Sequence, residues 1–358
     1  MKNLIYYIVI VILISCNSNH ENKFFTISVD SAEETNHSLS EIAENIEAVE
    51  LELTDNSLLS VQRITRILYK ENFIIVSQRN SVMLFDKTGK FIRQIGSIGQ
   101  GPGEFAGIQD IAADFENKHL FILAFEGKII CYDFDGNLIK ESPNNYYNGF
   151  FKCVYYINGK FLLLAESALV LDEEKINRTV LYTVDKNLLK TDSIEVRKIP
   201  HLGIWFHPYS DFINYDGENT YFYYSDISQN PFVLDTLYQL KNNEIKPYLN
   251  LSFKNNGMVS GEKKIYLFNI YRSMRYVFSF YQHQFSGQQI WYYLCYDVKT
   301  NKGYKVKEGF TDDIHTGEKI KIRPFNYDSN KFYYLHTFIN DSEKEEQNPT
   351  LYIGTLKK

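Results

Sequence analysis

The chain has 358 residues, a formal net charge of -6 at pH 7, and an aromatic content of 16%. The charge argues against a nucleic-acid partner, because binding to a phosphate backbone needs a basic face and no cluster of Lys and Arg provides one. The 28 Tyr and 26 Phe favour packed β-sheets, since aromatic side chains fit the half-buried faces of strands better than helices.

The N-terminus has the pattern of a secretory signal. Lys2 precedes an apolar run that is too short to span a bilayer, for which about 20 apolar residues are needed, but that suits a signal peptide. The run ends in Leu13-Ile14-Ser15-Cys16, which resembles the lipobox of bacterial lipoproteins, where cleavage leaves the cysteine as a lipidated first residue. We therefore expect a signal peptide over 1–15, lipid on Cys16 and, because the sequence is polar, a flexible tether over 16–45. An ordinary signal peptide with an incidental cysteine is the alternative.

The most regular part of the chain is a repeat. The segment from Leu84 to Ile92 returns as the segment from Cys131 to Ile139, with an offset of 47 residues from Asp86 to Asp133. A unit that repeats at about 40 to 50 residues and is rich in aromatic and β-branched residues indicates the blades of a β-propeller. Both copies contain an Asp-x-x-Gly turn, in which Asp bonds the backbone ahead of it and Gly adopts the positive φ that closes the turn.

Four antiparallel strands are expected in each blade. In chain order, the expected strands lie at 64–69, 73–77, 82–86, 91–95; 108–114, 120–124, 128–133, 137–141; 151–156, 161–165, 179–184, 188–195; 212–215, 221–225, 235–240, 244–249; 276–281, 289–297, 303–306; and 325–327, 332–336, 351–355.

The last blade lacks a strand in this count. The segment 46–53 alternates apolar and acidic residues with a period of two, and its pairing there would hide two open sheet edges. The sequence therefore predicts an all-β fold, a six-bladed propeller over residues 46–358 that is closed by an N-terminal strand. The region 258–275 could hide a helix or an irregular strand, so seven blades remain an alternative.

One segment carries a family resemblance. The stretch from Gly96 to Phe105, with Gly107-Ile108 and Ala112-Ala113-Asp114 after it, resembles the phrase between blades of NHL-type repeats, and the whole chain is similar to bacterial six-bladed β-propeller lipoproteins. The resemblance implies a fold and a lipid-anchored place in the bacterial cell envelope, facing the periplasm or the exterior. It implies no activity, because the function of that family is mostly unassigned.

The chain departs from the NHL-type pattern at two points. Ser77 and Phe125 stand where an acidic residue usually closes the second strand, and Ala106-Gly107 replaces the expected Pro.

Two loops resemble ligand loops but are better explained as turns. The Gly-rich stretch at 99–103 is followed by Glu104 and a strand, whereas a phosphate loop needs a helix N-terminus or a following Lys-Ser/Thr. The Asp-rich stretch at 133–137 lacks the closing Glu of a calcium loop. We therefore expect a tight connection between blades and a hairpin turn.

The candidate binding residues come from loops and inner strands near the channel. His207, Tyr209 and Asp211 belong to the richest polar and aromatic cluster, at the entry to the fourth blade. The other candidates are Arg63 and Arg66 at the first inner strand and Asp110 at the second, with Asp110 expected to pair with an arginine across the channel. Either set could bind a ligand or only water.

Neither a metal nor a cofactor is expected, because the spacing gives no third ligand for a metal. Cys131, Cys153 and Cys295 are expected to be buried thiols, with a bridge between the first two as the alternative.

No nucleophile elbow, zinc helix or Ser-x-x-Lys pair occurs in the sequence. The leading interpretation is a lipid-anchored, non-catalytic propeller that binds a small ligand, glycan, peptide or envelope protein at one end of its channel. One alternative is a hydrolase or lyase acting on carbohydrate or peptide with its site in the channel. Another is a scaffold whose exposed aromatic strands dock a partner.

Overall fold

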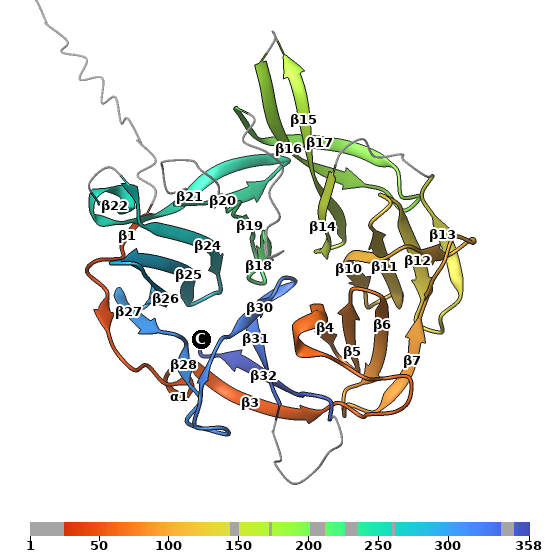
Figure 1. Cartoon of the computed structure of the whole chain (residues 1–358), viewed down its shortest axis with the longest axis horizontal. Helices are drawn as coiled ribbons and strands as arrows, with labels where there is room; N and C mark the ends of the chain where they lie inside the picture. The colour runs from red at the N-terminus through yellow and green to blue at the C-terminus, as the bar shows by residue number, and fades with distance from the viewer. Residues whose placement is uncertain are drawn as a thin grey trace, which may run out of the picture.

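The computed structural model describes residues 25–143, 150–171, 174–200, 212–225, 235–259, 262–337 and 347–358. Within these ranges the fold is a ring of six sheets, each built on four antiparallel strands (Figure 1). The predicted six-bladed β-propeller is therefore confirmed.

The first three blades follow one another along the chain, each from its inner to its outer strand. Their strands are β4 (Ile64–Lys70), β5 (Phe73–Gln78), β6 (Ser81–Asp86), β7 (Phe91–Ile95); β10 (Ile108–Asp114), β11 (His119–Ala124), β12 (Ile129–Asp133), β13 (Leu138–Glu141); β14 (Phe150–Ile157), β15 (Lys160–Leu171), β16 (Glu174–Val184), β17 (Lys190–Pro200).

The last three blades also receive strands from the N-terminal part of the chain. Their own strands are β18 (Ile213–Tyr215), β19 (Thr220–Phe222), β20 (Thr236–Lys241), β21 (Glu244–Ser252); β24 (Ile265–Arg272), β25 (Tyr276–Phe285), β26 (Gln288–Asp297), β27 (Lys302–Lys307); β30 (Arg323–Phe325), β31 (Asp328–His336), β32 (Thr350–Leu356).

The inner strand of the fifth blade lies in the region that the sequence left unassigned. It is β24, which pairs along its length with β25. Most of its side chains are buried, on both faces of the sheet, so the strand lacks the alternation that identifies a half-buried strand. A short hairpin of β22 (Met258–Val259) and β23 (Glu262–Lys263) precedes it.

The N-terminal strap, residues 25–50, follows the outer rim of three blades (Figure 1). It consists of β1 (Phe25–Ser28), β2 (Glu33–Glu34), the helical turn α1 (Leu39–Ile42) and β3 (Ala43–Glu50). β1 pairs in parallel with β21, β2 pairs in parallel with β27, and β3 completes the sixth blade antiparallel to β32. The strand predicted to close the ring is present, three residues earlier than expected.

The N-terminal strap shows that the flexible tether expected over 16–45 is wrong for residues 25–45. Residues 25–45, expected to be flexible, form paired strands and a helical turn instead. Ile27 is 1% exposed and Leu39 is 0% exposed, so apolar side chains of the strap belong to the hydrophobic core. The sequence carries no clear sign that the strap is ordered, because its buried apolar residues stand singly among polar ones and form no long periodic pattern.

The hydrophobic core lies between the faces of neighbouring blades. Ile75 of the first blade and Ile122 of the second, for example, are fully buried in one cluster. The three described cysteines are buried and form no disulfide, so the alternative of a bridge between Cys131 and Cys153 is not realised. Burial raises the pKa of Cys131 to about 11, which keeps the thiol protonated and inert at neutral pH. None of the helices in the described ranges is long and apolar enough to cross a membrane.

Candidate functional site

A cavity of about 1030 Å³ opens at the end of the channel where the inner strands of the first three blades begin. We call it the entry cavity. Its wall is formed by the 3-10 turn η1 (Val61–Arg63), the turn between β5 and β6, the turn between β11 and β12, and the first residues of β10 and β14. All these segments lie at one end of their blades because adjacent strands run antiparallel.

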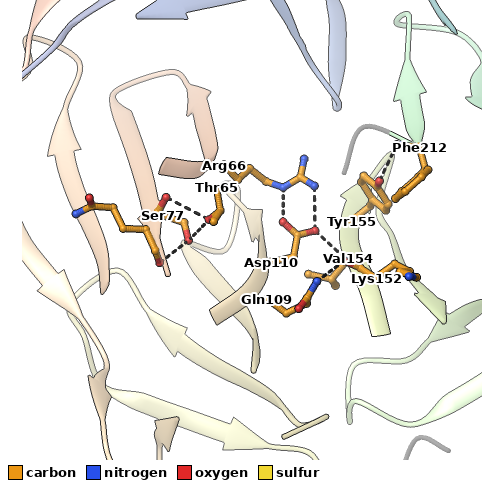
Figure 2. Close-up of polar contacts among 10 residues, drawn as sticks. Thr65, Arg66, Ser77, Gln109, Asp110, Lys152, Val154, Tyr155 and Phe212 are labelled. Carbon is orange, nitrogen blue, oxygen red and sulfur yellow. Dashed lines mark hydrogen bonds and ion pairs between the residues drawn. The ribbon is translucent and has the colours of Figure 1, made fainter. Parts of the chain in front are cut away.

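Next to this cavity, the inner strands are joined by a buried ion pair (Figure 2). Arg66 Nε lies 2.5 Å from Asp110 Oδ1, and Arg66 Nη2 lies 2.9 Å from Asp110 Oδ2. The Val154 N–H also donates to Asp110 Oδ2, at 2.9 Å, so the carboxylate connects three blades. Burial raises the pKa of Asp110, and the ion pair and hydrogen bonds with Arg66 oppose that rise.

A second buried charge cluster lies in the third blade. Lys152 Nζ is 3.0 Å from Glu166 Oε2, and both side chains are less than 5% exposed. The Tyr224 hydroxyl donates to the same carboxylate at 3.2 Å, which ties in the fourth blade. Gln109 Nε2 donates to the Lys152 carbonyl at 3.3 Å, from the second blade to the third. Because their partners are fixed, these groups form a rigid polar layer beside the cavity rather than free acids or bases.

The wall of the entry cavity carries two exposed arginines. Arg63 ends η1, and Arg79 lies in the turn between β5 and β6. Among the described residues neither guanidinium forms an ion pair, and the Arg79 guanidinium lies 5.1 Å from the centre of the Phe125 ring. The one carboxylate among the described residues of the wall, Glu126, lies 3.8 Å from Lys128 Nζ, which Glu141 shares at 3.5 Å. Two guanidinium groups thus face one partly compensated carboxylate. The wall is therefore electropositive.

A second cavity, of about 540 Å³, opens at the other end of the same blades. Its wall includes Tyr69, Tyr156 and Tyr327 and the carboxylate of Asp114. Asp114 accepts hydrogen bonds from Asn117, with 2.7 Å to its side-chain nitrogen, and Tyr327 accepts one from the Tyr69 N–H at 2.7 Å. Much of the polar capacity of this wall is thus used within the protein.

The structure brings together half of the predicted binding residues. Arg63 lines the entry cavity, and Arg66 and Asp110 form the expected pair, although between neighbouring blades rather than across the channel. The remaining candidates, His207, Tyr209 and Asp211, and the lipidation candidate Cys16, lie outside the described residues.

Sequence reasoning did not identify Arg79 and Phe125 as members of one site. A signal was present in the sequence comparison above, in which Phe125 departs from the acidic residue that the NHL-type resemblance leads one to expect at the end of the second strand. That position faces the entry cavity, and Arg79 occupies the equivalent turn of the preceding blade.

The two loops that resemble ligand loops use their polar groups internally. Glu104 Oε2 accepts the Gly101 N–H at 2.7 Å, so the carboxylate of the loop occupies a donor that a phosphate would need. Asp133 accepts the Asn137 N–H at 2.8 Å, as a hairpin turn requires. Within the described residues, no group of three or more His, Cys, Asp or Glu could hold a metal ion.

The fold and the cavity define a six-bladed β-propeller with an open cavity where the inner strands of its first three blades begin. A family model described as Domain of unknown function (DUF4934) matches residues 24–355, and the chain belongs to this family.

Two solved structures are among those that resemble this chain. One, described as "Putative exported protein (BF0058)" from Bacteroides fragilis NCTC 9343, has a TM-score of 0.65 and 17% identity and covers 93% of this chain and 99% of that chain. The other, the Pan2 WD40 domain of Neurospora crassa, has a TM-score of 0.42 and 8% identity, with 82% and 76% covered. No curated protein matches the sequence. The first likeness establishes the fold alone.

Proposed function

We propose that this protein is a non-catalytic binding module of the bacterial cell envelope that holds its ligand in the entry cavity. The observation that carries the proposal is the cavity itself, which has an electropositive wall and a rigid polar layer beside it. Small-molecule sites are typically preformed hollows of about 300–1,000 Å³ with a few fixed polar groups. The entry cavity has the size and the wall chemistry of such a site.

The frame of the cavity supports a preformed site. The Ile108 N–H donates to the Arg79 carbonyl at 2.8 Å, and the Phe125 N–H donates to the Gly107 carbonyl at 3.0 Å. These bonds fasten the turns of the first two blades to the inner strand of the second. A ligand would therefore meet a wall that is already ordered, which lowers the entropic cost of binding.

The wall gives little support to the alternative of a hydrolase or lyase. Glycoside hydrolysis generally uses two carboxyl groups on opposite sides of the scissile bond. Among the residues that the structure describes, Glu126 is the single carboxylate of the wall, while Asp110 and Glu166 are engaged by Arg66 and Lys152. We therefore assign the cavity to binding.

The envelope location rests on the N-terminal sequence and on the likeness to a protein of Bacteroides fragilis described as exported. In this proposal lipid on Cys16 holds the propeller at the membrane. The variant Cys16→Ala should move the protein from the membrane fraction to the soluble fraction. Unchanged retention would refute the lipid anchor without affecting the binding proposal.

A thermal-shift screen of the full chain against glycans, peptides and divalent metals tests the binding proposal. A ligand that binds only the native state raises the melting temperature by mass action. The shift should disappear in Gln109→Leu and Phe125→Ala, which change the wall, and persist in Lys87→Ala. Lys87 is an exposed residue of the β6–β7 turn, at the opposite end of the first blade. A shift that survives both wall changes would place the ligand elsewhere.

A further inference from the structure

We infer that the ligand of the entry cavity is anionic and that Arg63 and Arg79 together hold its acidic group. This inference rests on the proposed function and specifies the ligand class: a small polar molecule with a carboxylate or phosphate group. Both groups offer several acceptor oxygens to a guanidinium, which binds them through paired N–H donors.

The pairing of β4 with β5 brings the two arginines to the same end of the first blade, where both line the entry cavity. The last register pair of these strands is Ile64 with Gln78. Arg63, the last residue of η1, directly precedes Ile64, and Arg79 directly follows Gln78, so both arginines lie just beyond the same end of this antiparallel ladder. Two positive charges on one wall repel each other, and among the described residues no carboxylate is paired with either arginine. An anion between them would remove that repulsion.

Arg79 is held in place without losing its charge. Its carbonyl accepts the Ile108 N–H at 2.8 Å, and its guanidinium lies over the Phe125 ring. A cation–π contact positions an arginine but leaves its N–H donors available. The neighbouring Gly107 gives the ring its room, because a Cβ at Gly107 would collide with the Phe125 ring.

Arg63 is positioned by hydrogen bonds of the loop and turn that carry it. Gln78, which is 8% exposed, accepts the Ser60 N–H at 3.0 Å and donates to the Leu58 carbonyl at 3.0 Å. This clamp fixes the loop that leads into η1. The Arg63 N–H in turn donates to the Ser60 carbonyl at 2.8 Å, which closes the turn that carries the guanidinium. Gln78 is therefore a positioning residue for Arg63.

The rest of the wall suits the neutral part of such a ligand. The carboxamides of Gln62, Asn80 and Gln109 face the same cavity and can both donate and accept hydrogen bonds. Phe150 adds an apolar surface that is 45% exposed. Hydrogen-bond donors and acceptors beside aromatic rings suit a ligand with several hydroxyl groups, such as a sugar, better than a plain hydrocarbon chain.

Three probes that share one sugar body test the inference: glucuronate, glucose 6-phosphate and glucose. Affinities are measured on the full chain by thermal shift and by isothermal titration, at matched ionic strength. The variants are Arg63→Gln, Arg79→Gln and the matched control Lys87→Gln. Loss of a charged hydrogen bond should weaken binding about ten- to hundredfold in each arginine variant, with no change in the control.

The three probes distinguish a carboxylate ligand from a phosphate ester, and they distinguish failure of the anionic-ligand inference from failure of the proposed function. Binding of glucuronate alone assigns a carboxylate ligand, and binding of glucose 6-phosphate alone assigns a phosphate ester. Equal binding of glucose, or unchanged affinity in both arginine variants, overturns the anionic ligand while leaving a binding site in the cavity. Absence of binding by both acidic probes also overturns it. The proposed function has its own test: it is refuted if the thermal-shift screen finds no ligand whose binding is lost in Gln109→Leu or Phe125→Ala.

Discussion

Arg66 and Asp110 form a two-point ion pair that joins the inner strands of the first and second blades, with 2.5 Å and 2.9 Å between their nitrogen and oxygen atoms. The side chains are 5% and 1% exposed. A two-point pair is directional as well as charged, so it fixes how the first two blades sit beside the entry cavity.

Removing one member of this pair should destabilise the protein. Asp110→Ala leaves the buried guanidinium of Arg66 without its carboxylate, and we expect the free energy of unfolding to fall by about 3–5 kcal/mol. The double variant Arg66→Met and Asp110→Leu should lose less, because no buried charge remains. Urea denaturation of the three proteins measures both values. A single variant as stable as the wild type would show that the pair is unimportant.

Leu39→Ala tests the N-terminal strap. Leu39 is 0% exposed in a core cluster that also contains Phe278 and Phe332, so its truncation should cost about 2–5 kcal/mol of unfolding free energy. Glu33→Ala, an exposed change in the same strap, should cost under about 0.5 kcal/mol. Equal, small effects of the two changes in thermal or urea unfolding would support the flexible tether instead.

The two repeated Asp-x-x-Gly turns give a matched comparison. Gly136 has a φ of +85°, and a Cβ there would meet only the Arg93 side chain, at 3.8 Å, so Gly136→Ala should cost only the backbone strain, about 1–2 kcal/mol. Gly89 has a φ of +89°, but a Cβ there would collide with the Glu50 carbonyl oxygen of the strap. Gly89→Ala should therefore cost a further ~1–3 kcal/mol. Equal melting temperatures of the two variants would contradict the docking of the strap at this turn.

Asp312 should make stability depend on acid pH. Burial alone would raise its pKa, but hydrogen bonds from the Tyr334 hydroxyl at 2.8 Å and from the His315 N–H at 3.0 Å outweigh burial and lower the pKa below 3.8. A lowered pKa in the folded state stabilises the protein above pH 3.8, and this contribution is lost as the pH falls through the folded-state value.

The variant Asp312→Asn should therefore be less stable than the wild type at pH 7, and the difference should shrink below about pH 4. Melting temperatures of both proteins between about pH 7 and about pH 2.5 measure this trend. A difference that stays constant over the whole range would show that the carboxylate charge contributes nothing.

The blades could be predicted from the sequence where local chemistry repeats. The turns at Asp86 and Asp133 and the alternating segment that became β3 identified the ring and its closure, because turn residues and period-two patterns depend on near neighbours. β24 was not predicted because it is buried on both faces and shows no alternation. The strap was not predicted because it buries isolated side chains against distant blades.

The candidate site was predictable to a smaller extent. Arg63, Arg66 and Asp110 were identified because each lies at the start of an inner strand. Arg79 was not, because its place beside Arg63 depends on the register between β4 and β5, and its contact with Phe125 depends on how two blades pack. Such contacts between segments far apart in the chain leave no local pattern.

The most direct measurement of the central claim is a pair of crystal structures of the protein, one soaked with glucuronate and one with glucose 6-phosphate. We expect the carboxylate or the phosphate of at least one probe between the guanidinium groups of Arg63 and Arg79, with the sugar against the wall of the entry cavity. An ordered ligand at the opposite mouth beside Tyr69 and Tyr327, or an entry cavity that is empty with both probes at saturating concentration, would contradict the claim.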